Sequence, residues 1–437
     1  MSEKKSVIPP GVILPFVLVT SLFALWGFAN DITNPMVAAF KNILLISNFE
    51  SSLVQFAFYG GYCVMAFPAA LFIKRFSYKS GILLGLLLYA LGCLLFIPSG
   101  RMVSFEAFLI SYFIMTCGLS FLETSSNPYI LSMGPEETST RRLNFAQSFN
   151  PIGSLIGMLT ARNLILQRLN PATEAARQTL AQTDPSALAA IRDQDLSVII
   201  GPYAWLGAVV LAFFILFVVV RLPKAKEEED STGLDLGGTF RRLWHNKKYI
   251  EGVVAQTFYV GAQIMCWTFI IQYAGDALGM SKAEAQKYNM IAMGIFVSSR
   301  FVCTHLLKFF SPGGLLLALA SGGFAFILGT ILIQGLTGLW CLVGVSACMS
   351  LMFPTIYGIA LKGLGDDAKL GSAGLIMAIG GGCLMPPMQA AIMDMDAFNL
   401  GFMTLSSVRA SFVLPLICFV VIAVYGFRTS NVHKHVG

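Results

Sequence analysis

The chain has 437 residues, of which 56% are hydrophobic and 12% are charged, and its formal net charge at pH 7 is +6. Because a soluble domain carries about 25% charged residues, this chain has too few polar groups to cover so much apolar surface in water. These proportions exclude a water-soluble enzyme and a disordered protein, and they argue against a nucleic-acid-binding protein.

Twelve apolar stretches are long enough to cross a bilayer as helices, since one crossing needs about 20 mainly apolar residues. The first stretch continues through Asp31 and Asn34 and has no small-residue cleavage site, so we expect a retained helix and not a removed signal peptide. The predicted fold class is an all-α membrane protein with twelve transmembrane helices. In chain order the stretches are 12–40, 52–74, 80–98, 105–132, 144–167, 198–221, 250–274, 286–308, 313–334, 338–361, 372–394 and 407–427.

The loops between these stretches differ in charge from one side to the other. With the amino terminus placed inside, most lysine and arginine residues fall in the inside loops. Cytoplasmic loops of membrane proteins carry an excess of these residues. An even number of crossings returns the carboxy terminus to the same side, so both termini are predicted to be cytoplasmic. The other long loop, residues 168–197, lies outside and is expected to contain a short surface helix.

A polar segment divides the twelve stretches into two sets of six. It covers residues 223–248 and includes the charged run 224–230, which is typical of a solvated linker. We therefore predict an amino-terminal six-helix half at 1–222, a cytoplasmic linker at 223–248 and a carboxy-terminal six-helix half at 249–437.

Prolines occur at corresponding places in the two halves. Pro128 and Pro354 lie in the fourth stretch of each half, and Pro151 and the pair Pro386-Pro387 lie in the fifth. Proline frees a backbone carbonyl inside a membrane helix, which is tolerated where a cavity or a neighbouring helix satisfies it. Interrupted helices at matching places are typical of transporters whose substrate binds between the two halves.

Two carboxylates lie inside predicted membrane helices, where an ionisable group is costly and is a functional candidate by default. Asp31 shares a helix face with Asn34, and Glu123 shares one with Asn127, because these pairs are three and four residues apart. A carboxylate in a low-dielectric cavity tends to hold a proton near neutral pH. We therefore predict that Glu123 and Asp31 carry a coupled proton. The alternative is that hydrogen bonds fix each carboxyl group to a neighbouring helix.

A polar and aromatic stripe marks the seventh stretch. Tyr259, Gln263 and Trp267 are spaced by four residues and share one helix face. Such a set suits a sugar, whose hydroxyls need paired donors and acceptors and whose C–H face stacks on an aromatic ring. Alternatively, these side chains join neighbouring helices. Trp26 either lines the cavity or packs against lipid. The remaining candidate substrate-binding residues are Asn34, Asn127, Gln147 and Asn150.

The sequence contains no motif for metal binding, cofactor binding or ATP hydrolysis. The nine cysteines include no C-x-x-C pair, and the four histidines lack the spacing of metal ligands, so we predict no metal site and no cofactor. A phosphate-binding G-x-x-x-x-G-K-[ST] loop is absent, which argues against ATP-driven transport. Arg300 is the basic exception within the eighth stretch, where it either pairs with a carboxylate or reaches the cytoplasmic interface.

Six segments together carry a resemblance to a known family, and they cover nearly all of the membrane domain. They are SLFALWGFAN at 21–30, FAFYGGY at 56–62, LETSSNP at 122–128, RLNFAQSFN at 142–150, YVGAQ at 259–263 followed by Cys266-Trp267, and FPTI at 353–356. On these segments the chain resembles the fucose–galactose–glucose proton symporters of the major facilitator superfamily, and within them it is most similar to the L-fucose–proton branch. The resemblance implies the major facilitator fold, with two six-helix halves.

The family's working residues, as the resemblance implies, are one carboxylate on the first helix and one on the fourth. Glu123 matches the carboxylate of the fourth helix. Asn34 stands at the family's position on the first helix, and Asp31 lies one turn earlier, so either Asp31 and Glu123 share the coupled proton or Glu123 carries it alone. The basic segment 74–79 lacks the acidic residue of the usual facilitator signature, as it does in similar sugar symporters.

We therefore expect a multi-pass symporter of a bacterial cytoplasmic (inner) membrane that imports a monosaccharide, L-fucose as the first choice, with a proton by alternating access. The expected partners are the sugar, the proton and the lipid bilayer, with no nucleic acid, and the expected state is a monomer. Alternatives within this class are a glucose, galactose or amino-sugar symporter and a sodium-coupled sugar transporter. A membrane-embedded enzyme would need a catalytic cluster, and a channel would not need two similar halves; neither is favoured.

Overall fold

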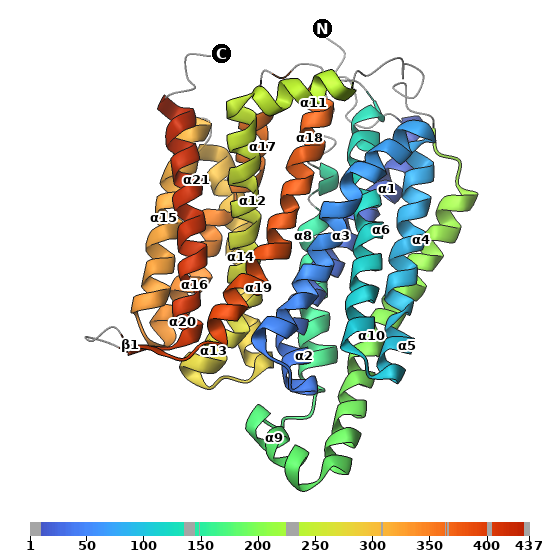
Figure 1. The fold of residues 1–437 in the computed structure, drawn as a ribbon. Coiled ribbons are helices and arrows are strands. Elements are labelled where there is room, and N and C mark those ends of the chain that lie inside the picture. The colour runs from blue at the N-terminus through green and yellow to red at the C-terminus, as the bar shows by residue number, and fades with distance from the viewer. Residues whose placement is uncertain are drawn as a thin grey trace. The chain divides into compact units, whose positions relative to one another are not determined.

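The computed structural model of the chain describes residues 10–134, 145–147, 149–223, 236–306, 309–362, 364, 367–399 and 404–431. The described segments are almost entirely helical (Figure 1). Within them, the strands are β1 (Phe398–Asn399) and β2 (Thr404–Leu405), which form one short antiparallel pair. The all-α architecture predicted from the sequence is confirmed.

The first of two compact units runs to Thr33 and resumes at Gly60. Within it, α4 packs along α6 and α1 packs along α8. Its elements are η1 (Pro10–Val12), α1 (Ile13–Thr33), the latter part of α3 (Asn48–Arg75), α4 (Tyr78–Leu94), α5 (Phe96–Met102), α6 (Phe105–Ser132), α8 (Phe149–Thr160), the π-helix η3 (Ala161–Leu166), α9 (Glu174–Thr183) and α10 (Pro185–Val219).

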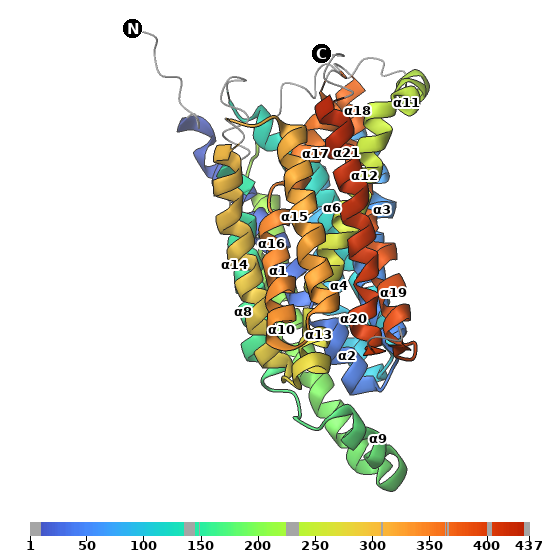
Figure 2. The ribbon, with the colours of Figure 1, turned by 90° about the vertical axis from the view of Figure 1, so that its left-hand side faces the viewer.

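The second unit consists of residues 34–59 and 235–437. In this unit α15 lies along α21 (Figure 2), and α12 contacts α17, α19 and α21. Its elements are α2 (Met36–Leu44), the start of α3, α11 (Leu236–His245), α12 (Lys247–Thr268), α13 (Ile270–Leu278), α14 (Lys282–Leu306), α15 (Pro312–Leu332), α16 (Gly335–Met349), α17 (Met352–Leu361), α18 (Ala368–Met377), η6 (Ala378–Gly380), α19 (Gly381–Met393), β1, β2, α20 (Ser407–Ser411) and α21 (Val413–Asn431).

Polar contacts tie residues 34–59 to the rest of the second unit. The Asp394 carboxylate, at the end of α19, accepts from the backbone N–H of Asn48 at 3.0 Å and from that of Phe49 at 2.7 Å. A carboxylate at a helix amino terminus satisfies N–H groups that lack partners within the helix. Farther along α3, the Gln55 amide donates to the Thr268 hydroxyl at 3.1 Å.

The division of the chain into halves at 1–222 and 249–437 stays a prediction. Residues 224–235 of the predicted linker lie outside the described residues.

The helices have the length and composition of membrane crossings. In the described part of the chain, nine helices are long and apolar enough to cross a membrane, and ten if α12 and α13, which are bent by 43°, form one span. The two other predicted stretches, 144–167 and 286–308, correspond to α8 with η3 and to α14. The structure therefore agrees with the twelve predicted crossings.

The prolines at corresponding places in the two halves do not have the same effect on their helices. The helix α6 continues through Pro128, whereas the crossing that contains Pro354 is divided into α16 and α17.

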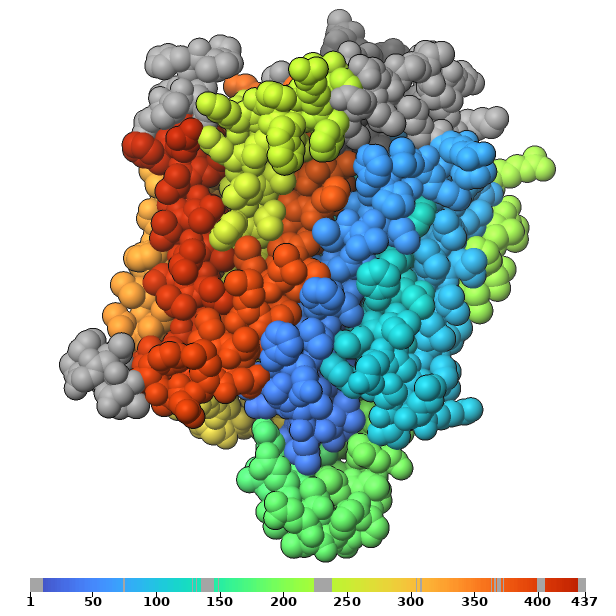
Figure 3. Space-filling model, viewed as in Figure 1, coloured from blue at the N-terminus to red at the C-terminus, as the bar shows by residue number. Residues whose placement is uncertain are grey.

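The surface of α21 has the apolar stripe of a lipid-facing helix. Figure 3 shows α21, in red, on the surface of its unit. Side chains at intervals of three and four residues share one helix face, and those on the exposed face of α21 are all apolar. In water such an exposed apolar stripe would promote aggregation, whereas in a bilayer it contacts lipid. The residues are Val413, Ile417, Val420, Val424 and Phe427.

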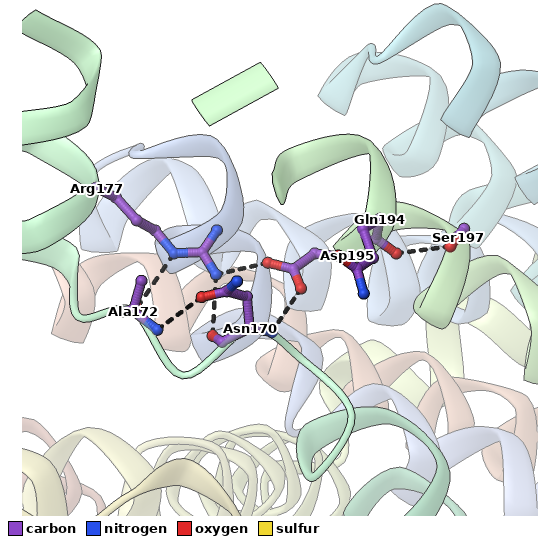
Figure 4. A network of polar contacts seen from close by, with 6 residues as sticks. All are labelled: Asn170, Ala172, Arg177, Gln194, Asp195 and Ser197. Atoms are coloured by element: carbon purple, nitrogen blue, oxygen red, sulfur yellow. Dashed lines mark hydrogen bonds and ion pairs between the residues drawn. The ribbon is translucent and has the colours of Figure 1, made fainter. Parts of the chain in front are cut away.

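The loop predicted at 168–197 contains the expected short helix, α9, and a longer extension of α10 than expected. Figure 4 shows the buried ion pair that joins them. Arg177 and Asp195 are both fully buried, with guanidinium nitrogen and carboxylate oxygen 2.5 Å apart. The second Asp195 oxygen accepts from the backbone N–H of Asn170 at 2.7 Å, and the Arg177 Nε donates to the Ala172 carbonyl at 3.2 Å. These bonds hold the connection before α9, and Arg177 of α9 itself, against α10 about three turns after its start.

Candidate functional site

Glu123 lies in the second half of α6, one turn before Asn127. Its side chain is half-buried, and its carboxylate has no hydrogen-bond or ion-pair partner among the described residues. The Asn127 amide donates to the Glu123 backbone carbonyl at 3.0 Å, and it accepts from the Gln147 amide at 3.3 Å. The structure therefore brings Glu123, Asn127 and Gln147 together. A carboxylic acid beside two amides can bind or release a proton and can exchange hydrogen bonds with a polar ligand.

Asn150 is held against α1 by a close approach of two helices. A Cβ atom on Gly27 would lie 2.2 Å from the Asn150 carbonyl oxygen, and one on Gly153 would lie 1.9 Å from the Ala24 carbonyl oxygen, so only glycine fits. At this short separation the Asn150 amide donates to the Phe23 carbonyl at 3.3 Å. The α1–α8 contact places Asn150, on α8, against the helix that carries Trp26 and Asp31.

Trp26 and Asp31 are both buried in α1. Trp26 is 5% exposed and packs on Phe23, with ring centroids 4.1 Å apart. Its burial within the unit argues for a packed position and against a lipid-facing one. Asp31 is 4% exposed and makes polar interactions within the structure. Asp31 thus differs from Glu123, which is more exposed.

Asn34 follows α1 and belongs to the second unit. It is 3% exposed, and its side-chain oxygen accepts from the Gln55 amide at 3.1 Å. Gln55 donates at the same distance to Thr268 of α12, so one amide joins Asn34 to that helix. Gln55 was not among the site residues predicted from the sequence. The sequence feature that could have identified Gln55 is that it is a single amide side chain within the apolar stretch 52–74.

The stripe on α12 is confirmed as one helix face, but two of its three donors have partners within the protein. The Tyr259 hydroxyl donates to the Met349 carbonyl at 3.0 Å, and the Trp267 indole N–H donates to the Ser346 hydroxyl at 3.1 Å. The Gln263 amide is half-buried and has no partner among the described residues. Gln263 therefore retains its full hydrogen-bonding capacity for a ligand.

The Trp267 ring has a fixed orientation. It packs edge-to-face on Phe296, with ring centroids 5.0 Å apart and planes at 82°, and the indole is 7% exposed. With its N–H bonded to Ser346 and one edge held by Phe296, the indole forms a rigid aromatic wall. Such a wall can stack on the C–H face of a sugar, and the Gln263 amide one turn away can bind its hydroxyls.

The predicted site residues fall into two sets, one in each unit. Neither set contains a group of three or more His, Cys, Asp or Glu side chains that could hold a metal ion, among the described residues. The chemistry available is that of a proton-binding acid in the first unit and of neutral donors, acceptors and rings in the second. The first set is Trp26, Asp31, Glu123, Asn127, Gln147 and Asn150, and the second is Asn34, Tyr259, Gln263 and Trp267.

Comparison with known proteins gives relatives along nearly the whole chain. The chain is 55% identical to the L-fucose-proton symporter of Haemophilus influenzae over 97% of this chain and 98% of the relative. It is 33% identical to the L-fucose-proton symporter of Escherichia coli, over 96% and 94% of the two chains. The glucose/galactose transporter of Brucella abortus is 28% identical, over 94% and 93%.

The fold matches a solved structure of the same kind. The crystal structure of a Major Facilitator Superfamily transporter, FucP, in the outward conformation aligns with a TM-score of 0.72 and 33% identity, over 95% of this chain and 98% of that one. The model of the Major Facilitator Superfamily matches residues 19–373. These findings confirm the resemblance and the fold predicted from the sequence segments. The chain therefore belongs to the Major Facilitator Superfamily.

Proposed function

We propose that this chain is a secondary active transporter, and not an enzyme, that imports L-fucose together with a proton. The observation that carries the proposal is its similarity to the Haemophilus influenzae L-fucose-proton symporter, which extends over nearly the whole of both chains. The chemistry of the candidate residues supports it, since the first unit holds an acid within a membrane helix and the second holds an aromatic wall beside an amide.

Glu123 is the proposed proton carrier. Its carboxylate lies in a membrane helix without a described partner, so a change in its charge is not opposed by an existing ion pair. Asp31 is buried and already makes polar interactions, and it is proposed as a second acid in the same pathway. Either both acids bind the coupled proton or Glu123 binds it alone, and the variants described in the Discussion separate these two mechanisms.

The proposed sugar contacts come from both sets of residues. Trp267 offers its ring, and Gln263 offers an amide without a described partner. Tyr259 donates its proton to a helix carbonyl, so it would meet a sugar through the lone pairs of its hydroxyl oxygen. Amide and aromatic side chains complete the set: Trp26, Asn34, Asn127, Gln147 and Asn150. All are uncharged, as expected for a site that binds a neutral sugar.

The chain is a multi-pass membrane protein, and we place it in the bacterial inner membrane as a monomer with both termini cytoplasmic. The excess of basic residues in the inside loops supports this orientation. Residues 1–222 and 249–437 are the proposed halves, joined by the linker 223–248. Alternating access then exposes the proton-binding and sugar-binding residues to each side of the membrane in turn.

The test is uptake of labelled L-fucose into proteoliposomes that contain the purified protein. An inwardly directed proton gradient should drive accumulation above the external concentration, and a proton ionophore should abolish it. Accumulation that needs sodium and ignores the proton gradient would contradict proton coupling and would favour the sodium-coupled alternative.

A second candidate substrate class is glucose and galactose, which the similarity to the Brucella abortus transporter favours. Competition by unlabelled sugars distinguishes the candidates. We expect excess L-fucose to block labelled uptake, with glucose, galactose and amino sugars much weaker. Stronger competition by one of these sugars would replace L-fucose as the proposed substrate.

A further inference from the structure

The tenth predicted crossing is broken between α16 and α17, and a proline explains where the break lies. In a continuous helix the N–H of residue 354 would donate to the carbonyl of Ser350, four residues earlier. Residue 354 is proline, which has no N–H, so this carbonyl loses its helical donor. In accordance with this, α16 ends at Met349 and α17 begins at Met352. A carbonyl left without a donor at membrane depth is costly, so it needs a partner from elsewhere.

Arg300 of α14 supplies that partner. Its Nε donates to the Ser350 carbonyl at 3.1 Å. The neighbouring carbonyl, that of Met349, is also at the end of α16, and it accepts from the Tyr259 hydroxyl at 3.0 Å. Two side chains from two other helices, α14 and α12, therefore satisfy the carbonyls at the break.

Arg300 is also joined to the aromatic wall. Its guanidinium carbon lies 4.9 Å from the centre of the Phe296 ring, a cation–π geometry. Phe296 in turn packs edge-to-face on Trp267, whose indole N–H donates to Ser346 of α16. One guanidinium thus contacts both the broken helix and the ring that supports Trp267.

We propose that Arg300 is a positioning residue for sugar binding, which holds the end of α16 and, through Phe296, the Trp267 ring in the binding orientation. An arginine within a membrane helix is costly, and packing alone would be met by an apolar side chain. Its planar guanidinium can donate a hydrogen bond at its edge while its face lies on a ring, and lysine cannot do both. The part of this proposal that concerns sugar rests on the proposed function.

A double-mutant cycle tests the contact with the broken helix. Arg300→Met removes the donor at similar side-chain length, and Pro354→Ala restores an N–H that can reach the Ser350 carbonyl. We expect Arg300→Met to lower the melting temperature of the purified protein, and we expect a smaller loss in the Pro354→Ala background, because the carbonyl then has a backbone donor. Additive effects of the two substitutions would overturn the assignment of this carbonyl to Arg300.

Binding of L-fucose, measured by calorimetry on the same four proteins, tests the positioning role. Arg300→Met should weaken binding by about tenfold, the scale of one lost hydrogen bond to a charged group. Pro354→Ala should recover part of that loss, and Arg300→Lys should bind with intermediate affinity. Wild-type affinity in Arg300→Met, with the stability coupling present, would reduce Arg300 to a structural residue and overturn the proposal.

Arg409 provides a matched control. It is 5% exposed and donates to the carbonyl of Ile331, so it is also a buried arginine bound to a helix carbonyl. Residue 335, four positions after that carbonyl, is glycine and has an N–H. Pro354→Ala should therefore give no recovery in an Arg409→Met protein, and recovery there would show a general stabilising effect that contradicts the specific pairing.

The two measurements keep this proposal separate from the proposed function. If the wild-type protein binds no L-fucose, the proposed function fails, while the stability cycle still decides whether Arg300 satisfies the Ser350 carbonyl. If Arg300→Met does not fold, the cycle is made with Arg300→Lys, which keeps the cation and loses the planar donor. The coupling with Pro354→Ala should then be smaller but of the same sign, and its absence would overturn the contact.

Discussion

The candidate residues of the two units differ in charge and in what holds them. In the first unit the central group is an acid, Glu123, whose carboxylate has no described partner. In the second unit Tyr259 and Trp267 are neutral, and their donors are bound to Met349 and Ser346 of α16. This difference suits the two sets to different roles. The first set can change its charge and bind a proton, and the second set offers a fixed surface for a sugar. Substitution of Glu123 should therefore abolish coupling, and substitution of Trp267 should weaken affinity.

The largest effect is expected from Glu123→Gln, which keeps the shape of the side chain and cannot release a proton. Uphill accumulation of L-fucose should fall to the external concentration, whereas exchange of labelled for unlabelled sugar across the membrane should continue. Both are measured in proteoliposomes.

Asp31→Asn distinguishes the two proton mechanisms. Loss of accumulation in this variant as well would mean that the two acids share the proton, and normal accumulation would assign it to Glu123 alone. Wild-type accumulation in Glu123→Gln would mean that this residue takes no part in coupling. It would also contradict the assignment of proton binding to Glu123 in the first unit.

A second buried acid in the first unit shows what a structural carboxylate looks like. Asp195 is fully buried, but unlike Glu123 it is paired with Arg177 and also accepts from the Asn170 N–H. Asp195→Ala leaves a buried guanidinium without its partner, a change that costs about 3–5 kcal/mol in soluble proteins. We expect a clear fall in melting temperature.

The surviving folded Asp195→Ala protein should keep its coupling, measured as gradient-driven accumulation per unit of folded protein. Arg177→Met is the matched variant, which leaves the acid unpaired. Loss of coupling with unchanged stability would show that the ion pair takes part in transport.

Trp267→Ala should weaken binding of L-fucose by about tenfold, because a stacked aromatic contact contributes on the order of 1 kcal/mol beyond its buried area. Trp267→Phe should lose less, since a ring remains and only the bond to Ser346 is gone. The control is Trp205→Ala, because Trp205 is 67% exposed on α10. Equal affinities in Trp267→Ala and wild-type protein would mean that the α12 stripe only joins helices.

The smallest effect is expected at an exposed ion pair of the second unit. The Arg242 guanidinium, bonded to both oxygens of Asp367 at 2.7 and 2.8 Å, holds the pKa of that carboxyl below its usual range. A lowered pKa in the folded state adds stability above the ordinary pKa of the acid, and this stability is lost as the pH falls through the lowered pKa.

Asp367→Asn should therefore lower the melting temperature slightly at pH 7 and have no effect in strong acid. A difference that persists at low pH would mean that packing of Asp367, and not its charge, stabilises the protein.

Periodicity predicted which residues share a helix face but not which helices meet. The i, i+4 spacing of Glu123 and Asn127 placed them together, and the structure shows the bond from the Asn127 amide to the Glu123 carbonyl. The same reasoning placed Tyr259 and Trp267 on one face. Their partners on α16 could not be predicted, because the pairing of helices depends on three-dimensional packing that the spacing within one helix does not contain.

The effects of proline and of polar residues in loops were predictable only in part. Pro354 was expected to interrupt its helix, and the break lies at Ser350 and Leu351, just before it, because the lost hydrogen bond is the one to the carbonyl four residues earlier. Residues 168–197 were expected to be a loop with one short helix. Asp184 caps the N–H of Ala187, so α10 begins at Pro185, long before its apolar part.

Coupling is tested most directly by asking whether sugar entry carries protons with it. L-Fucose is added to lightly buffered, de-energised vesicles that contain either wild-type protein or the Asp31→Asn, Glu123→Gln double variant, and the external pH is recorded. We expect a rise in external pH with wild-type protein, which a proton ionophore abolishes, and no rise with the double variant although labelled sugar still equilibrates. An equal rise with both proteins would contradict the claim that acids within the membrane helices couple the proton to the sugar.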